Sequence, residues 1–320
     1  MLIAVTLVMA ALAATPSDPI ETALEAPGPL GPLQGTMLAP ASGAAPMMLI
    51  IPGSGPTDRN GNNPLGVRAS TYRLLAEGLA AQGIGTVRID KRGMFGSRAA
   101  VADANAVTID DYVSDVEAWT GSVRKQTGAA CVWLMGHSEG GLVALAAAQK
   151  ATDICGLVLV STAGRPLGEV LRQQLRANPA NAPILDQAMA AIDALEAGQR
   201  VDVSAMNPAL MPLFAPQVQG FLVNAFSYDP AKLIAAVAKP LLIIQGKRDM
   251  QVGVADAERL KEAAPKAELV LLADTNHALK TVTSDDRRAN ALTYGNPNLP
   301  LAPGVVDTIA GFVNGGAKQP

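Results

Sequence analysis

Residues 131–149 read CVWLMGHSEGGLVALAAAQ, and this stretch decides the fold. Residues 131–135 form a short apolar run of strand length, and residues 142–148 are rich in Ala and Leu, as a buried helix is. Between them stands GHSEG at 136–140, a G-x-S-x-G pentapeptide at a strand-to-helix junction. A serine there sits on a tight, strained turn, and glycines flank it because a Cβ would clash with neighbouring backbone. The stretch predicts a nucleophile elbow, with an ordinary Gly-rich turn as the alternative.

Length and composition limit the classes of protein that fit. The chain has 320 residues, enough for one large α/β domain with insertions or for two smaller domains. A hydrophobic content of 49% supports a sizeable core, and an aromatic content of only 3% means that Ala, Val, Leu and Ile build it. The net charge of -3 comes without a block of basic residues, so a nucleic-acid-binding role is not expected.

The first residues have the pattern of an export signal. Residues 1–14, MLIAVTLVMAALAA, are apolar and end in a small-x-small sequence at 11–13, although no Lys or Arg precedes the run. The run is too short to span a bilayer as a helix, so we expect no stable membrane anchor. The pattern predicts a signal peptide and a periplasmic or secreted protein. The alternatives are an incorrectly assigned start or a plain terminal helix on a cytoplasmic protein.

Strand-like and helix-like segments alternate along most of the chain, which is typical of a parallel sheet covered by helices. An opening strand or hairpin is expected over 30–40, after an extended, Pro-rich lead-in. Further strands are expected over 47–51, 84–90, 131–135, 156–160, 240–245 and 269–272. Helices are expected over 71–82, 110–126, 142–148, 256–264 and 305–313.

Residues 164–239 interrupt this alternation. They contain one clear amphipathic helix over 184–197, followed by Met and Phe residues set among prolines. An insertion of this kind between two sheet strands indicates a cap over the carboxyl edge of the sheet, with plain surface helices as the alternative. Met211 and Phe214 are therefore candidates to line a substrate pocket.

A nucleophilic serine needs a base, usually a histidine that a carboxylate orients. The chain has two histidines, and His137 adjoins Ser138, so its side chain points elsewhere. His277 follows the last predicted strand and is the expected base. Asp249 follows the strand over 240–245 and is the expected acid, because functional groups gather where parallel strands end. Two rivals are less suitable: Asp256 looks like a helix cap, and Asp274 is close to His277 in sequence.

These three residues occur in the order nucleophile, acid, base, and the chain resembles the α/β-hydrolases over about residues 45–315. The loop GSGPTDRNGN at 53–62, the turn DKRG at 90–93 and NHALK at 276–280 resemble a bacterial serine esterase and serine-peptidase-like subgroup. The resemblance implies a core over 30–163 and 240–316, with a helical cap over 164–239 between the sixth and seventh strands.

The resemblance also implies an oxyanion hole made by two backbone N–H groups. By position these belong to Glu139 and to either Ser54 or Gly53. Many relatives have His where this chain has Pro52, and Phe95 replaces a glycine of the family's R-G-x-G-x-S turn.

Further residues are weighed for the substrate pocket. His137, Arg59 and Phe95 are candidates, although Arg59 and Asp58 also fit a role in fixing their own loop. Arg92 is expected to hold its turn rather than to bind substrate.

No metal or organic cofactor is expected. Asp58, Asn60 and Asn62 resemble a calcium loop only in part, because position 63 is not Gly and position 69, where the last carboxylate belongs, is Ala. Cys131 and Cys155 are expected to be buried free thiols, although neighbouring strands could bring them close enough for a bridge.

The predicted function is hydrolysis of a small-molecule carboxylic ester through an acyl-enzyme on Ser138, with His277 as base and acid and Asp249 orienting it. Peptide or amide hydrolysis is the alternative within enzymes, because fold does not decide the substrate. A catalytically silent binding protein on the same scaffold is the alternative outside enzymes. The natural substrate and the oligomeric state are not predicted.

Overall fold

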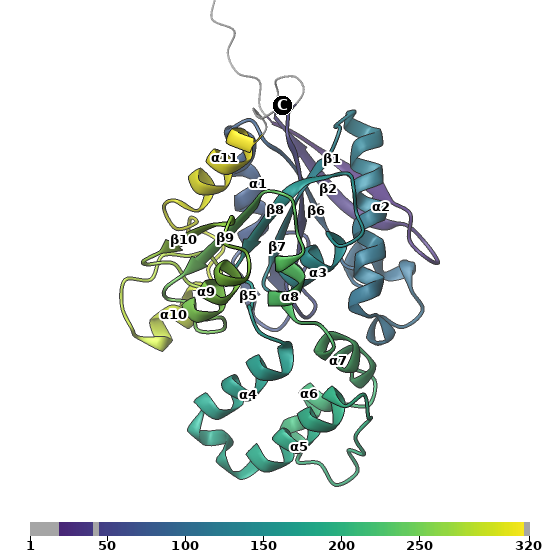
Figure 1. The fold of residues 1–320 in the computed structure, drawn as a ribbon, viewed down its shortest axis with the longest axis vertical. Helices are drawn as coiled ribbons and strands as arrows, with labels where there is room; N and C mark the ends of the chain where they lie inside the picture. The colour runs from purple at the N-terminus through teal and green to yellow at the C-terminus, as the bar shows by residue number, and fades with distance from the viewer. Residues whose placement is uncertain (1–18, 41–44, 317–320) are drawn as a thin grey trace, which may run out of the picture.

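The computed structural model describes residues 19–40 and 45–316, and the expected signal peptide at 1–14 lies outside them. Its centre is an eight-stranded sheet with the strand order β1-β2-β6-β3-β7-β8-β9-β10 (Figure 1). The six strands from β6 to β10 in this order run parallel, whereas β2 pairs antiparallel with β6 and β1 antiparallel with β2. The strands of this sheet are β1 (Ile20–Ala26), β2 (Leu33–Ala39), β3 (Met47–Ile51), β6 (Gly85–Ile89), β7 (Val132–His137), β8 (Ile154–Val160), β9 (Leu241–Gly246) and β10 (Glu268–Leu272).

Eleven helices are assigned within the described residues. They are α1 (Thr71–Ala81), α2 (Ile109–Thr127), α3 (Glu139–Ala147), α4 (Leu167–Ala177), α5 (Leu185–Glu196), α6 (Met211–Phe214), α7 (Gln219–Phe226), α8 (Pro230–Ala235), α9 (Val254–Ala263), α10 (Arg287–Thr293) and α11 (Val305–Gly316). Short 3-10 turns and one small hairpin complete the order. The turns are η1 (Phe95–Ala100), η2 (Ala104–Ala106), η3 (Pro179–Ile184) and η4 (Pro208–Leu210), and the hairpin consists of β4 (Asn62–Asn63) and β5 (Val67–Arg68). The mostly parallel sheet flanked by helices confirms the predicted fold class.

Strand β1 corrects the expected start of the core at residue 30. It lies in the segment predicted to be an extended lead-in, and it pairs along its whole length with β2. Five of its seven residues are exposed, because it is an edge strand. Such a strand lacks the buried apolar run by which the central strands are recognised.

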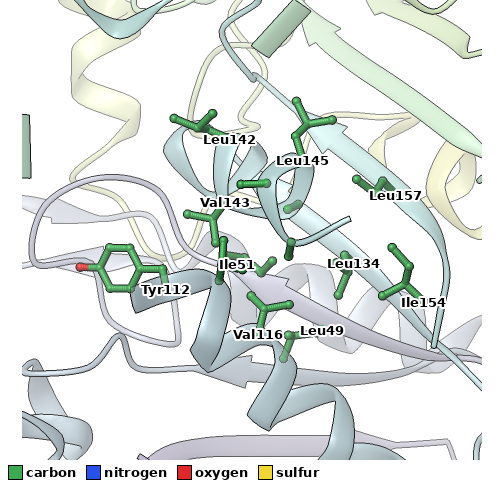
Figure 2. Close-up of a cluster of buried hydrophobic side chains, with 14 of the residues drawn as sticks. Leu49, Ile51, Tyr112, Val116, Leu134, Leu142, Val143, Leu145, Ile154 and Leu157 are labelled. Atoms are coloured by element: carbon green, nitrogen blue, oxygen red, sulfur yellow. The ribbon is translucent and has the colours of Figure 1, made fainter. Parts of the chain in front are cut away.

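The two faces of the sheet carry separate apolar layers, and the alternation of β3 shows how they form. Leu49 and Ile51 lie in the cluster that α2 and α3 cover, as Figure 2 shows. Met48 and Ile50 point to the other face and pack with α1 and α11. A strand buried on both faces is apolar at every position, which explains why MMLII was recognisable in the sequence.

The insertion over 164–239 leaves the sheet after β8 and returns at β9. Its helices α4 to α7 lie below the sheet in Figure 1 and enclose an apolar core of their own. The predicted amphipathic helix over 184–197 is α5, but α4 was not predicted. Leu167, Val170, Leu171 and Leu175 give α4 an apolar stripe, and their helical spacing is the pattern in the sequence that indicates this helix.

The two cysteines correct another expectation. Cys131 and Cys155 are not buried free thiols: they are only half-buried and form a disulfide. Cys131 stands directly before β7 and Cys155 is the second residue of β8, and these strands are neighbours in the sheet. Their Cα atoms lie 5.2 Å apart, within the range that a disulfide requires. The sequence alone gave neither the pairing of the strands nor the directions of the two side chains.

Candidate active site

The turn between β7 and α3 holds Ser138 in a strained conformation. Its backbone has φ 55° and ψ -120°, a conformation that residues other than glycine rarely adopt. A Cβ added at Gly136 would lie 2.3 Å from the Gly140 carbonyl oxygen, and one added at Gly140 would lie 2.2 Å from the Ile51 oxygen. Only glycine fits at both positions, so the turn has the close packing that the G-x-S-x-G pattern predicts.

His277 and Asp249 meet on the loops that follow β10 and β9. Nδ1 of His277 lies 2.7 Å from Oδ2 of Asp249, and both side chains are nearly inaccessible to solvent. Oδ1 of Asp249 accepts the backbone N–H groups of Gln251 and Val252 at 2.8 and 3.0 Å. Burial acts to raise the pKa of Asp249, but the charge and hydrogen bond of His277 and these N–H groups hold it below its usual value.

The protonation of this pair follows from the same contact. An ionised carboxylate can only accept, so Nδ1 of His277 carries a hydrogen and donates it to Asp249. In the neutral imidazole Nε2 is then left as an acceptor, which is the form that a general base requires. Ser138 and His277 line one cavity, although within the described residues no hydrogen bond joins the two side chains.

The two rival carboxylates lie in other contacts. Asp256 is buried inside the first turn of α9 and forms an ion pair with Arg165, at 2.7 Å. It is not the cap of this helix, as was expected, because Gly253 occupies that position. Asp274 is half exposed and lies 3.8 Å from Arg248. The hydrogen bond to His277 therefore distinguishes Asp249 from both.

Two backbone N–H groups of the loop after β3, those of Gly53 and Ser54, differ in whether they already have a partner. The N–H of Gly53 donates to the Tyr72 hydroxyl at 3.0 Å, so it is already occupied. The Gly53 carbonyl accepts from Nζ of the buried Lys91 at 2.8 Å. Because C=O and N–H point in opposite directions in a trans peptide, the Ser54 N–H points away from Lys91. In the described part of the chain neither the Ser54 N–H nor the Glu139 N–H donates a hydrogen bond, so both are free to bind another group, whereas the Gly53 N–H is not.

His137 belongs to a buried chain of hydrogen bonds. Its Nε2 lies 2.9 Å from the backbone carbonyl of His277, and its Nδ1 lies 2.9 Å from the Tyr72 hydroxyl. Burial, together with the nearby His277, lowers the pKa of His137 to about 3. The ring is therefore neutral: Nε2 donates to the carbonyl, and Nδ1 accepts from Tyr72. This chain connects the loop of Gly53 to the loop of His277.

Neither Tyr72 nor Lys91 is predicted as a site residue from the sequence. Tyr72 stands on the apolar face of α1, where a tyrosine is unremarkable. Lys91 is indicated by a usable sequence pattern, because it stands in the DKRG turn, separated from the buried strand β6 only by Asp90. A lysine in that place needs a specific partner to be buried.

Two of the expected pocket residues from the core lie elsewhere. Arg59 forms an ion pair with Asp90 and also donates to Thr36, so it fixes its loop. Phe95 begins the 3-10 turn η1 and is 40% exposed. Neither lines a cavity at Ser138, whereas His137 does.

The two expected pocket residues from the insertion are also misplaced. Phe214 is fully buried in the core of the insertion, and Met211 packs against the same cluster. Their neighbours Pro212 and Leu213 line a cavity at Ser138 instead. A short helix can turn only part of its surface to a cavity, and the sequence does not show which part.

Two other turns behave as predicted. Oδ1 of Asp58 accepts the backbone N–H groups of Asn60 and Asn62, both at 2.8 Å, as a loop-fixing side chain does. Arg92 pairs with Asp111 and Asp115 of α2 and so holds the turn after β6.

Within residues 19–40 and 45–316, no group of three or more His, Cys, Asp or Glu is arranged to hold a metal ion. None of the helices in these residues combines the length and the hydropathy of a membrane-spanning segment.

Two cavities meet at Ser138. The smaller one measures about 170 Å³ and has the side chains of His277, Tyr72 and Tyr294 in its wall. The larger one measures about 400 Å³, and most of its wall is apolar and belongs to the insertion. Ser54, Ser138 and Gln251 border both.

The esterase EstD of Thermotoga maritima is 26% identical to this chain over 245 residues, which cover 74% of the chain and 55% of the relative. The chain thus spans about half the length of this curated relative. Two solved structures share the fold: Est1E from Butyrivibrio proteoclasticus, with a TM-score of 0.57, 15% identity and coverage of 93% of this chain and 99% of that one; and the esterase Pf2001 from Pyrococcus furiosus, with a TM-score of 0.55, 15% identity and coverage of 92% of both chains.

A family model covers most of the core. The model described as Hydrolase_4, serine aminopeptidase, S33, matches residues 65–281, which contain the elbow, the loop of Asp249 and the loop of His277. Together with the mostly parallel sheet and the elbow geometry, this match places the chain among the α/β-hydrolases, and the protein belongs to the serine aminopeptidase S33 family (Hydrolase_4) within them.

Proposed function

We propose that the protein hydrolyses carboxylic esters through an acyl-enzyme on Ser138. Nε2 of His277 takes the proton of the Ser138 hydroxyl as it attacks the ester carbonyl, and then gives that proton to the departing alkoxide. Asp249 keeps the imidazole in the tautomer with Nδ1 protonated and stabilises its charged form. Water then attacks the acyl-enzyme, with His277 again acting as base.

The single observation that carries this proposal is the 2.7 Å contact of Asp249 with His277, whose side chain lines the same cavity as Ser138. The backbone N–H groups of Glu139 and Ser54 act as oxyanion donors. Lys91 keeps the Gly53–Ser54 peptide in the orientation that this role requires, because it binds the carbonyl on the opposite side of the peptide.

Aminopeptidase activity is the second candidate, because the family carries that description. An aminopeptidase must bind the charged amino terminus of its substrate, for which a carboxylate is the usual partner. Among the described residues, Glu139 is the one carboxylate that borders either cavity at Ser138, and it lies 3.4 Å from Lys91. With its charge already balanced by Lys91, this carboxylate favours an ester over a peptide with a free amino terminus.

The insertion over 164–239 acts as a cap in this proposal, since it supplies most of the wall of the larger cavity. We also propose that the protein is related to the esterase-like subgroup. The loop GSGPTDRNGN at 53–62 supports this, because its Gly53 and Ser54 border the smaller cavity at Ser138. The relative named an esterase agrees with this choice of reaction.

We also propose that the protein is exported. The disulfide between Cys131 and Cys155 supports this, because disulfides persist in oxidising compartments and are rare in the cytosol. Mass analysis of the exported protein's first residue tests it, with cleavage after residue 13 or 14 as the expected result.

Kinetics on two substrate types test the reaction. We expect purified protein to turn over a nitrophenyl ester with a kcat/KM at least about a hundredfold above that for an aminoacyl arylamide, and Ser138→Ala to abolish the turnover. A preference for the arylamide would favour the peptidase. Turnover of neither substrate, with correct folding, would favour a silent binding protein.

A further inference from the structure

The two cavities at Ser138 differ in how they lie relative to the base. His277 borders the smaller cavity and is absent from the wall of the larger one. In ester cleavage the imidazole that takes the serine proton must reach the oxygen of the leaving alcohol to return it. The leaving group therefore has to lie on the side of His277.

The walls of the two cavities differ in chemistry as well. Of the residues that the structure describes, no Asp, Glu, Lys or Arg lines the smaller cavity, whose wall carries hydroxyl and amide groups from Thr57, Asn63, Gln251 and Tyr294. These groups match a small, neutral, polar alcohol. A volume of about 170 Å³ is too small for a long alkyl chain in addition to the reacting atoms.

The larger cavity suits the opposite kind of group. Its apolar wall comes from Leu142 of α3 and from α4, α6 and α7 of the insertion, with Leu171, Leu213 and Phe221 among its members. Its charged members, Glu139 and Arg165, each have a partner of opposite charge. An aliphatic chain in this cavity would bury apolar surface at about 25 cal/mol per Å² without leaving a charge unpaired.

We infer, on the basis of the proposed ester hydrolysis, that the enzyme takes esters of a medium-length aliphatic acid with a small polar or short alcohol, with the acyl chain in the larger cavity and the alcohol in the smaller one. The reverse arrangement, a short acid joined to a long alcohol, puts the alkyl chain on the side of His277, where there is no room for it.

A pair of reversed esters tests this orientation directly. Ethyl octanoate and octyl acetate contain the same atoms, so differences in overall hydrophobicity cannot explain a preference. We expect kcat/KM for ethyl octanoate to exceed that for octyl acetate by about tenfold or more, since each methylene that fits its pocket contributes a severalfold factor. A ratio near one, or a preference for octyl acetate, would overturn the orientation.

Filling the larger cavity sharpens the test. Leu171→Trp should lower the ratio of ethyl octanoate to ethyl acetate turnover by about tenfold, because the indole occupies the space of the acyl chain. Gln173→Trp is the matched control: it adds the same group to the exposed side of α4 and should leave the ratio unchanged. An unchanged ratio in folded Leu171→Trp would also contradict the inference.

The outcomes separate this inference from the proposed function. If the parent protein hydrolysed neither ester, the proposed function itself would be wrong. Turnover that depends on Ser138 but prefers octyl acetate would leave the function intact and reject only the assignment of the cavities.

Discussion

The sheet core and the insertion contribute different things to the same site. The side chains proposed for the chemistry come from the core, on loops that follow β7, β9 and β10. The insertion contributes most of the apolar wall of the larger cavity. The comparison indicates that changes in the core should alter the rate for every substrate, whereas changes in the insertion should alter which substrate is preferred.

The largest expected effect is on the core carboxylate. Asp249→Asn should lower kcat by about 10⁴, because an amide would favour the wrong tautomer of His277. Asp274→Asn is the matched control on the neighbouring loop, and its kcat should stay within about threefold of the parent value. If the two variants had similar kcat values, Asp249 would not be the orienting acid.

The disulfide tests whether the stability of the core can be changed without changing the substrate preference. It closes a segment with a sequence separation of 24, and its removal in a Cys131→Ala, Cys155→Ala double variant should lower the free energy of unfolding by about 3 kcal/mol. It joins the starts of β7 and β8, at the edge opposite the site, so the ratio of ethyl octanoate to octyl acetate turnover should not change. Urea unfolding and the kinetic ratio measure the two effects, and a changed ratio would contradict the separation of roles.

Lys91 tests the oxyanion loop of the core. Lys91→Met frees the Gly53 carbonyl and should lower kcat by about 10² while KM stays within about twofold, because the Ser54 N–H acts on the transition state. The exposed Lys266→Met serves as control and should leave both constants unchanged. An effect on KM alone would assign Lys91 to substrate binding instead.

His137 gives the smallest effect, which is on the way the free energy of unfolding changes with pH. Its pKa is about 3 in the folded protein and about 6.5 in the unfolded chain, so between these values the unfolded chain binds the extra proton. The free energy of unfolding should therefore fall as the pH falls below about 6.5, with a contribution from His137 approaching 1.4 kcal/mol per pH unit.

The variant His137→Gln removes this contribution. Its amide can still donate to the His277 carbonyl, and urea unfolding at about pH 7, pH 6 and pH 5 should show a shallower slope than the parent protein. Above about pH 7 the two slopes should agree, since His137 is neutral in both states there. Equal slopes at all three values would mean that His137 is not held neutral by the fold.

The same contrast explains what could be predicted from the sequence. Strand β3 was predicted with its observed bounds, and the elbow with its glycines, because burial on both faces and a strained turn each restrict the residues that fit. Asp249 and His277 follow from chain order and from the ends of the strands. In the insertion, the spacing identified α5, but Met211 and Phe214 turned out to belong to the core of the insertion, because sequence does not show which side of a short helix meets a cavity. Tyr72 and the disulfide depend on contacts between distant segments, which no local pattern records, and for Lys91 the sequence shows only a charged residue close after a buried strand, not its partner.

The central claim is that Ser138 is the nucleophile that the core activates, and covalent labelling tests it most directly. Treating the protein with a fluorophosphonate and mapping the adduct by peptide mass analysis should find it on Ser138. The label should be absent from Ser138→Ala and should form far more slowly in Asp249→Asn. An adduct on another residue, or labelling that persists in folded Ser138→Ala, would contradict the account.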